Sequence, residues 1–428
     1  MRSEVDVLIV GGGLSGLSAA YHLRDLEIAV LEMEGRPGGL CKSRHIDGFT
    51  FDMAGHVLHI RDEELRTFIH SIMEGNLAYK KRRSFVFMKG RFIPYPFQMN
   101  FWMIPEIAEE CMEGLVKARE KGGWEGEGGF EGWIKRNFGE GIARHFMIPY
   151  NRKLWRVPLS ELTSEWAEGF IPVPEIEEIQ KRIRRSDVGY NPVFYYPYRG
   201  GIEELVKGFL KFLRGKISVG TRLKEVIAEE RLARTDSGDE IRYGVLISSV
   251  PLKSLMEMVV DAPEDLKALG KRLRATSVLC YNLGVRGKPI PEAHWIYFPE
   301  ERFPFYRVGI PTNFAPHLAP DGYSSLYVEI SFGEGERPGE GIFRSVVEGL
   351  EELGIIGGEG DIAVKDVIWI ENAYCIYDEV RRKAVEEIIP YLEGKGIIPI
   401  GRYGRWEYSS MQDAIIQGRE VGRRCFGR

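Results

Sequence analysis

Three glycines near the amino terminus have the spacing needed to hold a dinucleotide. Gly11, Gly13 and Gly16 lie between an apolar stretch at residues 5–10 and a helical pattern, the context in which G-x-G-x-x-G binds a pyrophosphate. The first glycine permits a tight turn, the second lets the backbone approach the pyrophosphate, and the third lets the helix pack on the strand. The helix N-terminus then favours negative charge. Glu32 follows about 20 residues later, where an acidic side chain accepts a hydrogen bond from a ribose hydroxyl.

The residues after the second strand favour one cofactor over another. The glycine motif alone fits FAD and NAD equally, and a glycine turn without any ligand is the plainest alternative. The strand, helix, second strand and acidic residue in this order make that alternative unfavourable. Arg36-Pro37-Gly38-Gly39 resembles the Arg-x-Gly-Gly continuation of FAD enzymes of the amine oxidase and glutathione reductase type. We therefore expect FAD.

Composition excludes several classes of protein. A length of 428 residues predicts two or three domains, and a net charge of −5 argues against a general nucleic-acid binder. Five scattered cysteines without a C-x-x-C pair indicate a reducing compartment, with neither a metal site nor a disulfide framework. No signal peptide is expected before the first strand, and no apolar run reaches the roughly 20 residues of a membrane span. We expect a cytoplasmic protein without a transmembrane segment, and peripheral membrane contact stays open.

The elements that must position these residues form three groups. Helical patterns predict helices from Pro105 to about residue 121, over 130–145 and over most of 160–186. Residues 84–93 read as a hairpin, and 276–332 with 363–370 as an antiparallel sheet. Helices are also expected at 202–213, 341–353 and 378–393. Residues 122–129, rich in glycine, read as a linker by default, with a mobile lid as the alternative.

The expected fold class is α/β, with a Rossmann-like FAD domain, a helical insertion and an antiparallel substrate sheet. The FAD-binding domain is expected to be discontinuous, over residues 1–60, 195–255 and 395–428. The helical domain covers 100–186. The sheet domain covers 61–99 and 256–394.

The sequence offers no obvious protein nucleophile. Ser-His-Asp order, H-E-x-x-H, C-x-x-C and a P-loop are all missing, so a bound flavin would carry the chemistry. Loops and strands instead hold many Tyr, Trp, Arg and Asn residues. Each aromatic side chain taken singly is explained by core packing. As a group they also fit a nucleotide-sugar pocket, because arginine pairs diphosphate oxygens and aromatic rings stack on a base.

Six blocks in the same order give the chain a wider resemblance. They are Gly55-His56, 95–98 (YPFQ), 146–155 (FMIPYNRKLW), 295–300 (WIYFPE), 304–307 (PFYR) and 401–406 (GRYGRW). With these blocks the chain resembles the UDP-galactopyranose mutase family, particularly its eukaryotic-like branch, over nearly its whole length. This family lies within the FAD superfamily of amine oxidases and protoporphyrinogen oxidases.

The resemblance implies an isomerase that interconverts UDP-galactopyranose and UDP-galactofuranose, or a related nucleotide sugar, for cell-surface glycans. Reduced FAD would attack the anomeric carbon through N5 and expel UDP. The adduct would open as an iminium, and the sugar would reclose through another hydroxyl. The flavin must first be reduced, with NAD(P)H as a candidate external reductant. The implied partner is a UDP-sugar, and a homo-oligomer is compatible with the family.

The resemblance also implies roles for individual residues. The residues expected to be catalytic are His56, Arg307 and Arg402. Those expected at the cofactor are Gly11, Gly13, Leu14, Ser15, Gly16, Glu32, Arg36, Gly38, Gly39, Gly55, His56, Val226, Gly401, Arg402, Gln412 and Asp413. Those expected at the substrate are Arg82, Tyr95, Gln98, Asn151, Trp155, Trp295, Tyr297, Arg307, Tyr374 and Tyr408.

Three departures from the family pattern leave alternatives open. The family's Gly-Gly-His is Ala54-Gly55-His56 here. A second diphosphate arginine, expected just before Phe130, has no counterpart in residues 122–129. The asparagine expected shortly after Tyr408 is missing. An FAD-dependent oxidoreductase of the amine oxidase or protoporphyrinogen oxidase type is therefore the main alternative, and a catalytically weak flavoprotein is a third.

Overall fold

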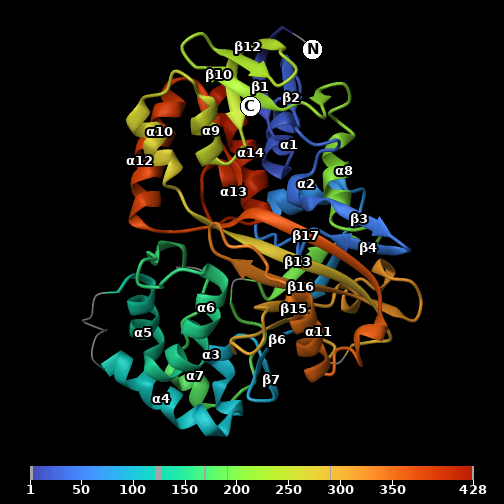
Figure 1. The fold of residues 1–428 in the computed structure, drawn as a ribbon, viewed down its shortest axis with the longest axis vertical. Helices are drawn as coiled ribbons and strands as arrows, with labels where there is room; N and C mark the ends of the chain where they lie inside the picture. Colours follow the sequence, from blue (N-terminus) through green and yellow to red (C-terminus); the bar gives the residue numbers. More distant parts are fainter. Residues whose placement is uncertain (1–2, 121–127, 168–169, 190, 290, 427–428) are drawn as a thin grey trace.

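The computed structural model describes residues 3–120, 128–167, 170–189, 191–289 and 291–426. Two seven-stranded sheets organise these residues. In Figure 1 the first sheet lies at the top with helices on both faces, the second crosses the middle and lower right, and a group of helices fills the lower left.

The first sheet is the expected dinucleotide-binding sheet. Its order is β10-β11-β12-β1-β2-β9, with β18 beside β12, and β1 pairs in parallel with both β2 and β12. Its strands are β1 (Glu4–Val10), β2 (Ile28–Leu31), β9 (Ile217–Ser218), β10 (Leu223–Ile227), β11 (Leu232–Thr235), β12 (Glu240–Ser248) and β18 (Ile397–Pro399).

Side chains of β1 alternate between two cores, as a strand buried on both faces requires. Val7 and Ile9 join the core that includes α1 (Leu14–His22) and α14 (Met411–Phe426). Leu8 and Val10 join the opposite core, which is closed by α9 (Leu252–Met258), α10 (Glu264–Lys271) and α12 (Glu379–Gly394). This sandwich fixes the end of β1, where the glycines begin.

The second sheet has the order β17-β13-β16-β15-β14-β6-β7. Its strands are β6 (Ser84–Met88), β7 (Arg91–Pro94), β13 (Ala275–Arg286), β14 (Trp295–Tyr297), β15 (Arg307–Gly309), β16 (Tyr323–Phe332) and β17 (Ile362–Cys375). The pairs are antiparallel as expected, apart from the parallel pair of β14 with β6. The hairpin expected at residues 84–93 is confirmed as β6 and β7. Helix α11 (Ile342–Glu352) packs on one face.

The helical region is shorter than the sequence pattern predicted. It contains α3 (Phe97–Asn100), α4 (Pro105–Glu120), α5 (Gly129–Ile142), α6 (Ile148–Trp155) and α7 (Ile176–Gln180). The prediction of helix over most of 160–186 is wrong: the described residues there form only α7 and a single turn at Glu165–Ala167. Pro172 and Pro174 explain this, because proline removes a helical donor and disfavours helix in the residue before it. Of the expected linker at 122–129, residues 122–127 lie outside the described part.

Five smaller pieces, two pairs of strands and three helices, connect these parts. A short hairpin, β3 (Ser43–Ile46) and β4 (Phe49–Asp52), follows the glycine-rich segment, and β5 (Ala78–Lys81) pairs with β8 (Val193–Tyr196). Helices α2 (Glu63–Ile72), α8 (Glu203–Leu210) and α13 (Gly401–Gly404) complete the connections.

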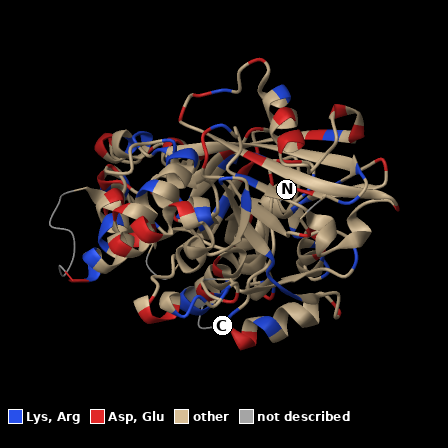
Figure 2. Cartoon of the chain, turned by 90° about the horizontal axis from the view of Figure 1, so that it is seen from below, with Lys and Arg blue, Asp and Glu red and all other residues tan. Residues whose placement is uncertain are grey.

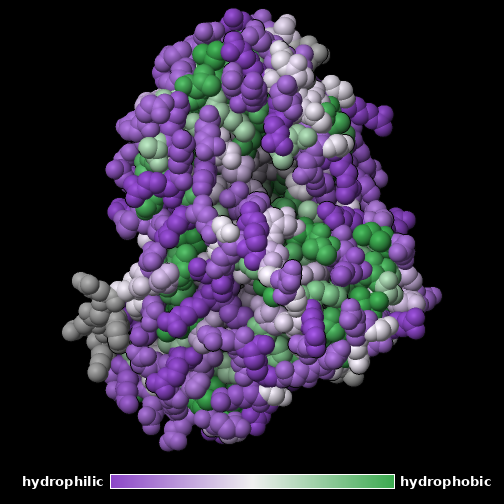
Figure 3. Space-filling model, viewed as in Figure 1, coloured by the Kyte–Doolittle hydropathy of each residue, from purple (hydrophilic) through white to green (hydrophobic). Residues whose placement is uncertain are grey.

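The surface carries charges of both signs in the views drawn. Figure 2 shows positions of Lys and Arg interspersed with positions of Asp and Glu along the helices, and Figure 3 shows a largely hydrophilic face with scattered apolar patches. No helix within the described ranges is long and apolar enough to cross a membrane.

Candidate active site

The glycine loop, residues 11–16, is shaped by close backbone approaches at the end of β1. Gly11 has φ +100°, a conformation that side chains rarely adopt. A Cβ at Gly16 would lie 2.0 Å from the carbonyl oxygen of Gly11, so only glycine lets α1 pack here. A Cβ at Gly13, in contrast, would meet no heavy atom within 4 Å. Gly13 therefore faces open space beside Leu14 and Ser15 of the α1 N-terminus, where an anion is favoured.

Glu32 lies beside this loop at the end of β2. Its Oε2 accepts from the backbone N–H of Gly12 at 2.9 Å, and its Oε1 accepts from the N–H of Glu34 at 2.8 Å. A carboxylate can accept about four hydrogen bonds, so both oxygens keep capacity for ribose hydroxyls. The position predicted from the spacing thus places an acidic group against the loop.

The second glycine segment folds back on the first. The N–H of Gly38 donates to the carbonyl of Gly12 at 2.7 Å. A Cβ at Gly39 would lie 3.3 Å from the Cα of Gly13. Both Gly38 (φ +128°) and Gly39 (φ +55°) adopt positive φ. The two glycine segments are therefore in contact, as a shared ligand requires.

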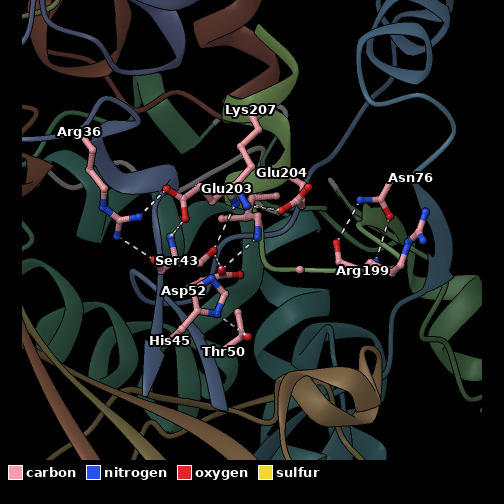
Figure 4. Close-up of polar contacts among 12 residues, drawn as sticks. Arg36, Ser43, His45, Thr50, Asp52, Asn76, Arg199, Glu203, Glu204 and Lys207 are labelled. Atoms are coloured by element: carbon pink, nitrogen blue, oxygen red, sulfur yellow. Dashed lines mark hydrogen bonds and ion pairs between the residues drawn. The ribbon is translucent and has the colours of Figure 1, made fainter. Parts of the chain in front are cut away.

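Arg36 binds to Glu203 and to the backbone of Ser43, beside Asp52. Its Nη1 pairs with Glu203 at 2.6 Å, and its Nη2 donates to the carbonyl of Ser43 at 2.8 Å (Figure 4). Glu203 opens helix α8. The structure thus gives Arg36 a fixed protein partner, and its predicted contact with the cofactor stays a prediction.

Asp52 joins these residues to the loop that carries His56. Its carboxylate accepts from Ser43 Oγ at 2.6 Å (Figure 4). It also accepts from Tyr196 OH at 2.6 Å and from the N–H of Ile202 at 3.0 Å. Burial, with a smaller contribution from the charge of Glu203, raises the pKa of Asp52 to about 6 despite the lowering effect of these hydrogen bonds. Asp52 therefore ties β4 to β3, β8 and the start of α8.

The other predicted cofactor residues are spread around the same sheet. Gly401 has φ +74°, and a Cβ there would meet Ser15 Oγ at 2.3 Å. Val226 is buried on β10. Gln412 Oε1 accepts from the N–H of Arg61 at 2.6 Å. Asp413 accepts from the N–H of Ser410 at 2.8 Å and helps to cap α14. Their predicted contacts with a cofactor stay predictions.

The loop of residues 54–56 is held in a strained form. Ala54 has φ +66°, in the left-handed region where glycine is free and alanine costs about 1 kcal/mol. A Cβ at Gly55 would lie 2.6 Å from the Tyr327 ring, and the Gly55 N–H donates to Glu329 at 3.1 Å. The family's glycine is thus replaced at a position whose conformation favours glycine.

The charges of Glu329, Arg307 and Arg402 act on the ring of His56. Burial, with smaller contributions from the charges of Arg307 and Arg402, lowers its pKa to about 4 despite the raising effect of Glu329. The ring is therefore neutral at neutral pH. Its Nδ1 is buried and has no hydrogen-bond partner among the described residues.

Arg307 forms a buried ion pair that the sequence did not indicate. Its Nε and Nη2 donate to the two oxygens of Glu329 at 2.6 and 2.7 Å, and Glu329 is only 1% exposed. Burial raises the pKa of Glu329, but the charge and hydrogen bonds of Arg307 lower it below its ordinary value. A guanidinium has five N–H groups, so three remain for another anion.

Arg402 is held differently. Its guanidinium donates to the carbonyls of Ala373 (2.8 Å) and Ser409 (2.9 Å), and it forms no ion pair within the part of the chain that the structure describes. Its Cζ lies 5.2 Å from the centroid of the Tyr374 ring and 4.9 Å from that of Tyr408. The site thus contains a positive charge balanced by ring faces and carbonyl dipoles rather than by a carboxylate.

Half-buried tyrosines complete this wall. Tyr297 contacts Tyr95 with ring centroids 4.9 Å apart and Tyr150 at 5.5 Å, and Tyr374 stacks on Tyr408 at 6.1 Å. Burial raises the pKa of the phenols of Tyr95, Tyr150, Tyr297 and Tyr374, so they are neutral donors. The arginine–tyrosine wall, as we call it, consists of Tyr95, Tyr150, Tyr297, Tyr306, Arg307, Tyr374, Arg402 and Tyr408.

Predicted residues near this wall have protein partners of their own. The indole of Trp295 donates to Tyr297 OH at 2.9 Å. Asn151 donates to the carbonyl of Met147 at 2.8 Å and accepts from the indole of Trp155 at 3.2 Å. Both groups therefore stiffen the wall, and their contacts with a substrate stay predictions.

A cavity of about 410 Å³ opens beside Arg82 and Gln98. Its lining residues are His59, Ile60, Arg61, Ile171, Pro172, Gly189, Pro192 and Val193. Gln98 donates to the Pro172 carbonyl at 2.9 Å, while its Oε1 is buried and unpartnered among the described residues. Arg82 donates to the carbonyls of Ser186, Val188 and Asn191, and its Cζ lies 5.0 Å from the Tyr95 ring.

Sequence reasoning missed four residues of the site. Glu329 and Tyr327 lie on β16, Tyr306 precedes β15, and Tyr150 lies on α6. Tyr150 and Tyr306 stood within the blocks that carried the resemblance, so their types were a signal. Glu329 stands in an apolar strand, where an acidic residue needs a buried partner; this was the signal that could have found it.

The residues present fit FAD. A cradle with open space at Gly13, a helix N-terminus and a carboxylate beside the loop match the pyrophosphate and ribose of a dinucleotide. The fold and this site define a flavin-dependent enzyme with a Rossmann-type cofactor sheet. The chain belongs to the family described as flavin containing amine oxidoreductase, whose model matches residues 14–425.

Individual relatives point in two directions. Among solved structures, a reduced UDP-galactopyranose mutase superposes with a TM-score of 0.92 and 29% identity, over 99% of this chain and 94% of that one. A putative protoporphyrinogen oxidase from Exiguobacterium sp. 255-15 has a TM-score of 0.76 and 17% identity, covering 99% of each chain. Among curated proteins, the carotenoid 3,4-desaturase of Haloarcula japonica is 22% identical over 88% of this chain and 85% of its own length.

Proposed function

We propose that this protein is an FAD-dependent mutase that interconverts the pyranose and furanose forms of UDP-galactose or a close relative. The observation that carries the proposal is the likeness to reduced UDP-galactopyranose mutase along 99% of the chain at 29% identity. The geometry of the arginine–tyrosine wall supports it, because a diphosphate needs cationic and phenolic donors facing one site.

Each part of the wall has a task in this proposal. Arg307 binds diphosphate oxygens with the N–H groups that Glu329 leaves over. Tyr374 and Tyr408 donate their hydroxyls to the same group. Arg402 keeps a positive charge where the flavin ring is expected and favours its anionic reduced form. FAD, when bound and reduced, supplies the nucleophile for the anomeric carbon of the sugar.

In this proposal the nucleoside of the UDP-sugar binds beside Tyr95 and Gln98. The unpartnered Oε1 of Gln98 accepts a hydrogen bond from a base N–H, and the Tyr95 ring offers a stacking face. The cavity beside them is within the size range of small-molecule sites. His56, neutral at neutral pH, lies on the strained loop that follows Ala54.

The test is turnover by the reduced protein. The dithionite-reduced protein is incubated with UDP-galactofuranose, and formation of UDP-galactopyranose is followed by chromatography. The oxidised protein is the control and should give none. Absence of product together with no UDP-induced change in flavin absorbance would contradict the proposal.

A second function has its own observation in favour. The matching family model and the desaturase and protoporphyrinogen oxidase relatives are named for oxidation chemistry. In that case the flavin would pass electrons to oxygen or another acceptor. Substrate-dependent oxygen uptake without isomerisation of UDP-galactofuranose would favour this oxidoreductase and oppose the mutase.

A further inference from the structure

One lysine joins the helical region to the wall strands. Lys153 lies on α6, and its Nζ donates to the carbonyls of Phe298 (2.9 Å), Glu300 (3.1 Å) and Phe305 (2.6 Å). An ammonium has three N–H groups, so all of its donors go to one short segment. Lys153 forms no ion pair within the described ranges, which makes the three carbonyls its whole set of polar partners there.

That segment connects two strands of the arginine–tyrosine wall. Residues 298–306 follow Tyr297 of β14 and lead directly into Arg307 of β15. The segment is also closed on itself, because the N–H of Phe298 donates to the Tyr306 carbonyl at 2.9 Å. The hydrogen bonds of Lys153 to the carbonyls of this segment therefore fix the positions of Tyr297 and Arg307 at its two ends.

The helix that carries Lys153 supplies the facing part of the wall. Tyr150, on the same helix, contacts the rings of Tyr297 at 5.5 Å and Tyr306 at 6.4 Å. Burial lowers the pKa of Lys153 to about 7, against the raising effect of Glu300 and Glu301. An ammonium is costly to bury without hydrogen bonds. All three hydrogen bonds of the Lys153 ammonium go to the segment that connects β14 and β15.

We propose that Lys153 is a positioning residue that sets the spacing between α6 and the strands carrying Tyr297 and Arg307, and thereby the binding of the diphosphate substrate. The inference rests on the proposed function for the identity of the ligand. The contacts that carry it lie outside the groups assigned to the substrate.

The experiment compares Lys153→Met with Lys135→Met in the FAD-loaded protein. Lys135 lies on α5 of the same helical region, where its Nζ pairs with Glu131 at 3.5 Å and Glu140 at 3.6 Å. We expect Lys153→Met to raise the Kd for UDP and the KM for UDP-galactofuranose at least tenfold, with kcat within a factor of three. Lys135→Met should change neither, and Lys153→Arg should recover part of the affinity because it restores a cationic donor.

The KM against kcat pattern separates positioning from general stability. A merely structural role would lower the active fraction, and hence apparent kcat, at unchanged KM and unchanged UDP affinity; that result would overturn the inference. Amide hydrogen exchange at residues 305–308 should also quicken in Lys153→Met and not in the control. If the wild type binds no UDP, the proposed function fails separately, and unchanged exchange at residues 305–308 would then overturn the role of Lys153.

Discussion

The glycine loop and the arginine–tyrosine wall are built in opposite ways. The loop is made of consecutive backbone atoms, and its shape follows from where a Cβ would collide: 2.0 Å from a carbonyl at Gly16, and nowhere within 4 Å at Gly13. The wall is made of side chains from α6, β14, β15, β17, α13 and the loops beside them, brought together across more than 300 residues of sequence. Backbone geometry specifies the first region, and ion pairs and ring contacts specify the second.

This difference explains why the two regions respond differently to substitution. In the loop, one methyl group either collides with the chain, as at Gly16, or enters open space, as at Gly13. In the wall, each charge depends on a partner from another element, so that removing one partner leaves the other charge buried and uncompensated. The largest effects are therefore expected in the wall.

Glu329→Gln is expected to have the largest effect on stability. It leaves the Arg307 guanidinium without its carboxylate partner, and breaking a buried pair in this way costs roughly 3 kcal/mol. Urea denaturation of the FAD-loaded protein measures the loss. The comparison is sharpened by Glu329→Gln combined with Arg307→Met, which should be more stable than Glu329→Gln alone because no uncompensated charge remains.

The same pair tests the wall as a binding surface. Arg307→Met should weaken UDP binding at least tenfold, about 1.4 kcal/mol, and leave FAD bound, because the hydrogen bonds of Arg307 to described residues go to Glu329 and not to the glycine loop. Calorimetry with UDP gives the affinity, and flavin absorbance gives the FAD content. Equal UDP affinity in Arg307→Met and wild type would remove Arg307 from the substrate site.

The difference between the glycine loop and the wall also explains which features could be predicted from the sequence. The strand, turn and helix at residues 4–22 and the β6–β7 hairpin were predictable because their signals are local and periodic. The Arg307–Glu329 pair was not, because the β15–β16 register that makes them neighbours is a tertiary fact. The helix wrongly expected over 160–186 failed for a related reason: apolar spacing was given more weight than the two prolines that interrupt it.

Asp52 belongs to neither region: its carboxylate is held by Ser43, Tyr196 and the N–H of Ile202, and its titration provides a third case for the comparison. Its folded-state pKa of about 6 lies above the ordinary value of 3.8. Asp52 therefore contributes stability that is fully present below pH 3.8 and is lost as pH rises through about 6. The difference corresponds to roughly 3 kcal/mol at most. Glu203, which raises this pKa, is itself paired with Arg36.

The measurement is the free energy of unfolding of wild type and Asp52→Asn from pH 4 to pH 7.5. The wild-type value minus the variant value should fall as pH rises through this range. Asp321→Asn, at an exposed turn, is the control and should track wild type. A flat difference between wild type and Asp52→Asn would show that Asp52 holds its three donors without a raised pKa.

Gly13→Ala is expected to have the smallest effect on stability and a selective effect on FAD binding. Gly13 has φ −75° and ψ 179°, which alanine adopts freely, and a Cβ added there would touch no protein atom within 4 Å. The stability of the FAD-free protein should therefore stay within about 0.5 kcal/mol of wild type. A pyrophosphate lying against the Gly13 backbone would collide with the new methyl group, so the Kd for FAD should rise at least tenfold.

Gly35→Ala is the matched control, because Gly35 lies outside the glycine loop and a Cβ there also meets nothing within 4 Å. If both variants bind FAD like wild type, the open space at Gly13 does not receive the pyrophosphate. If Gly13→Ala alone binds FAD more weakly, the open space at Gly13 receives the cofactor, whereas Gly16 is required by the packing of the chain.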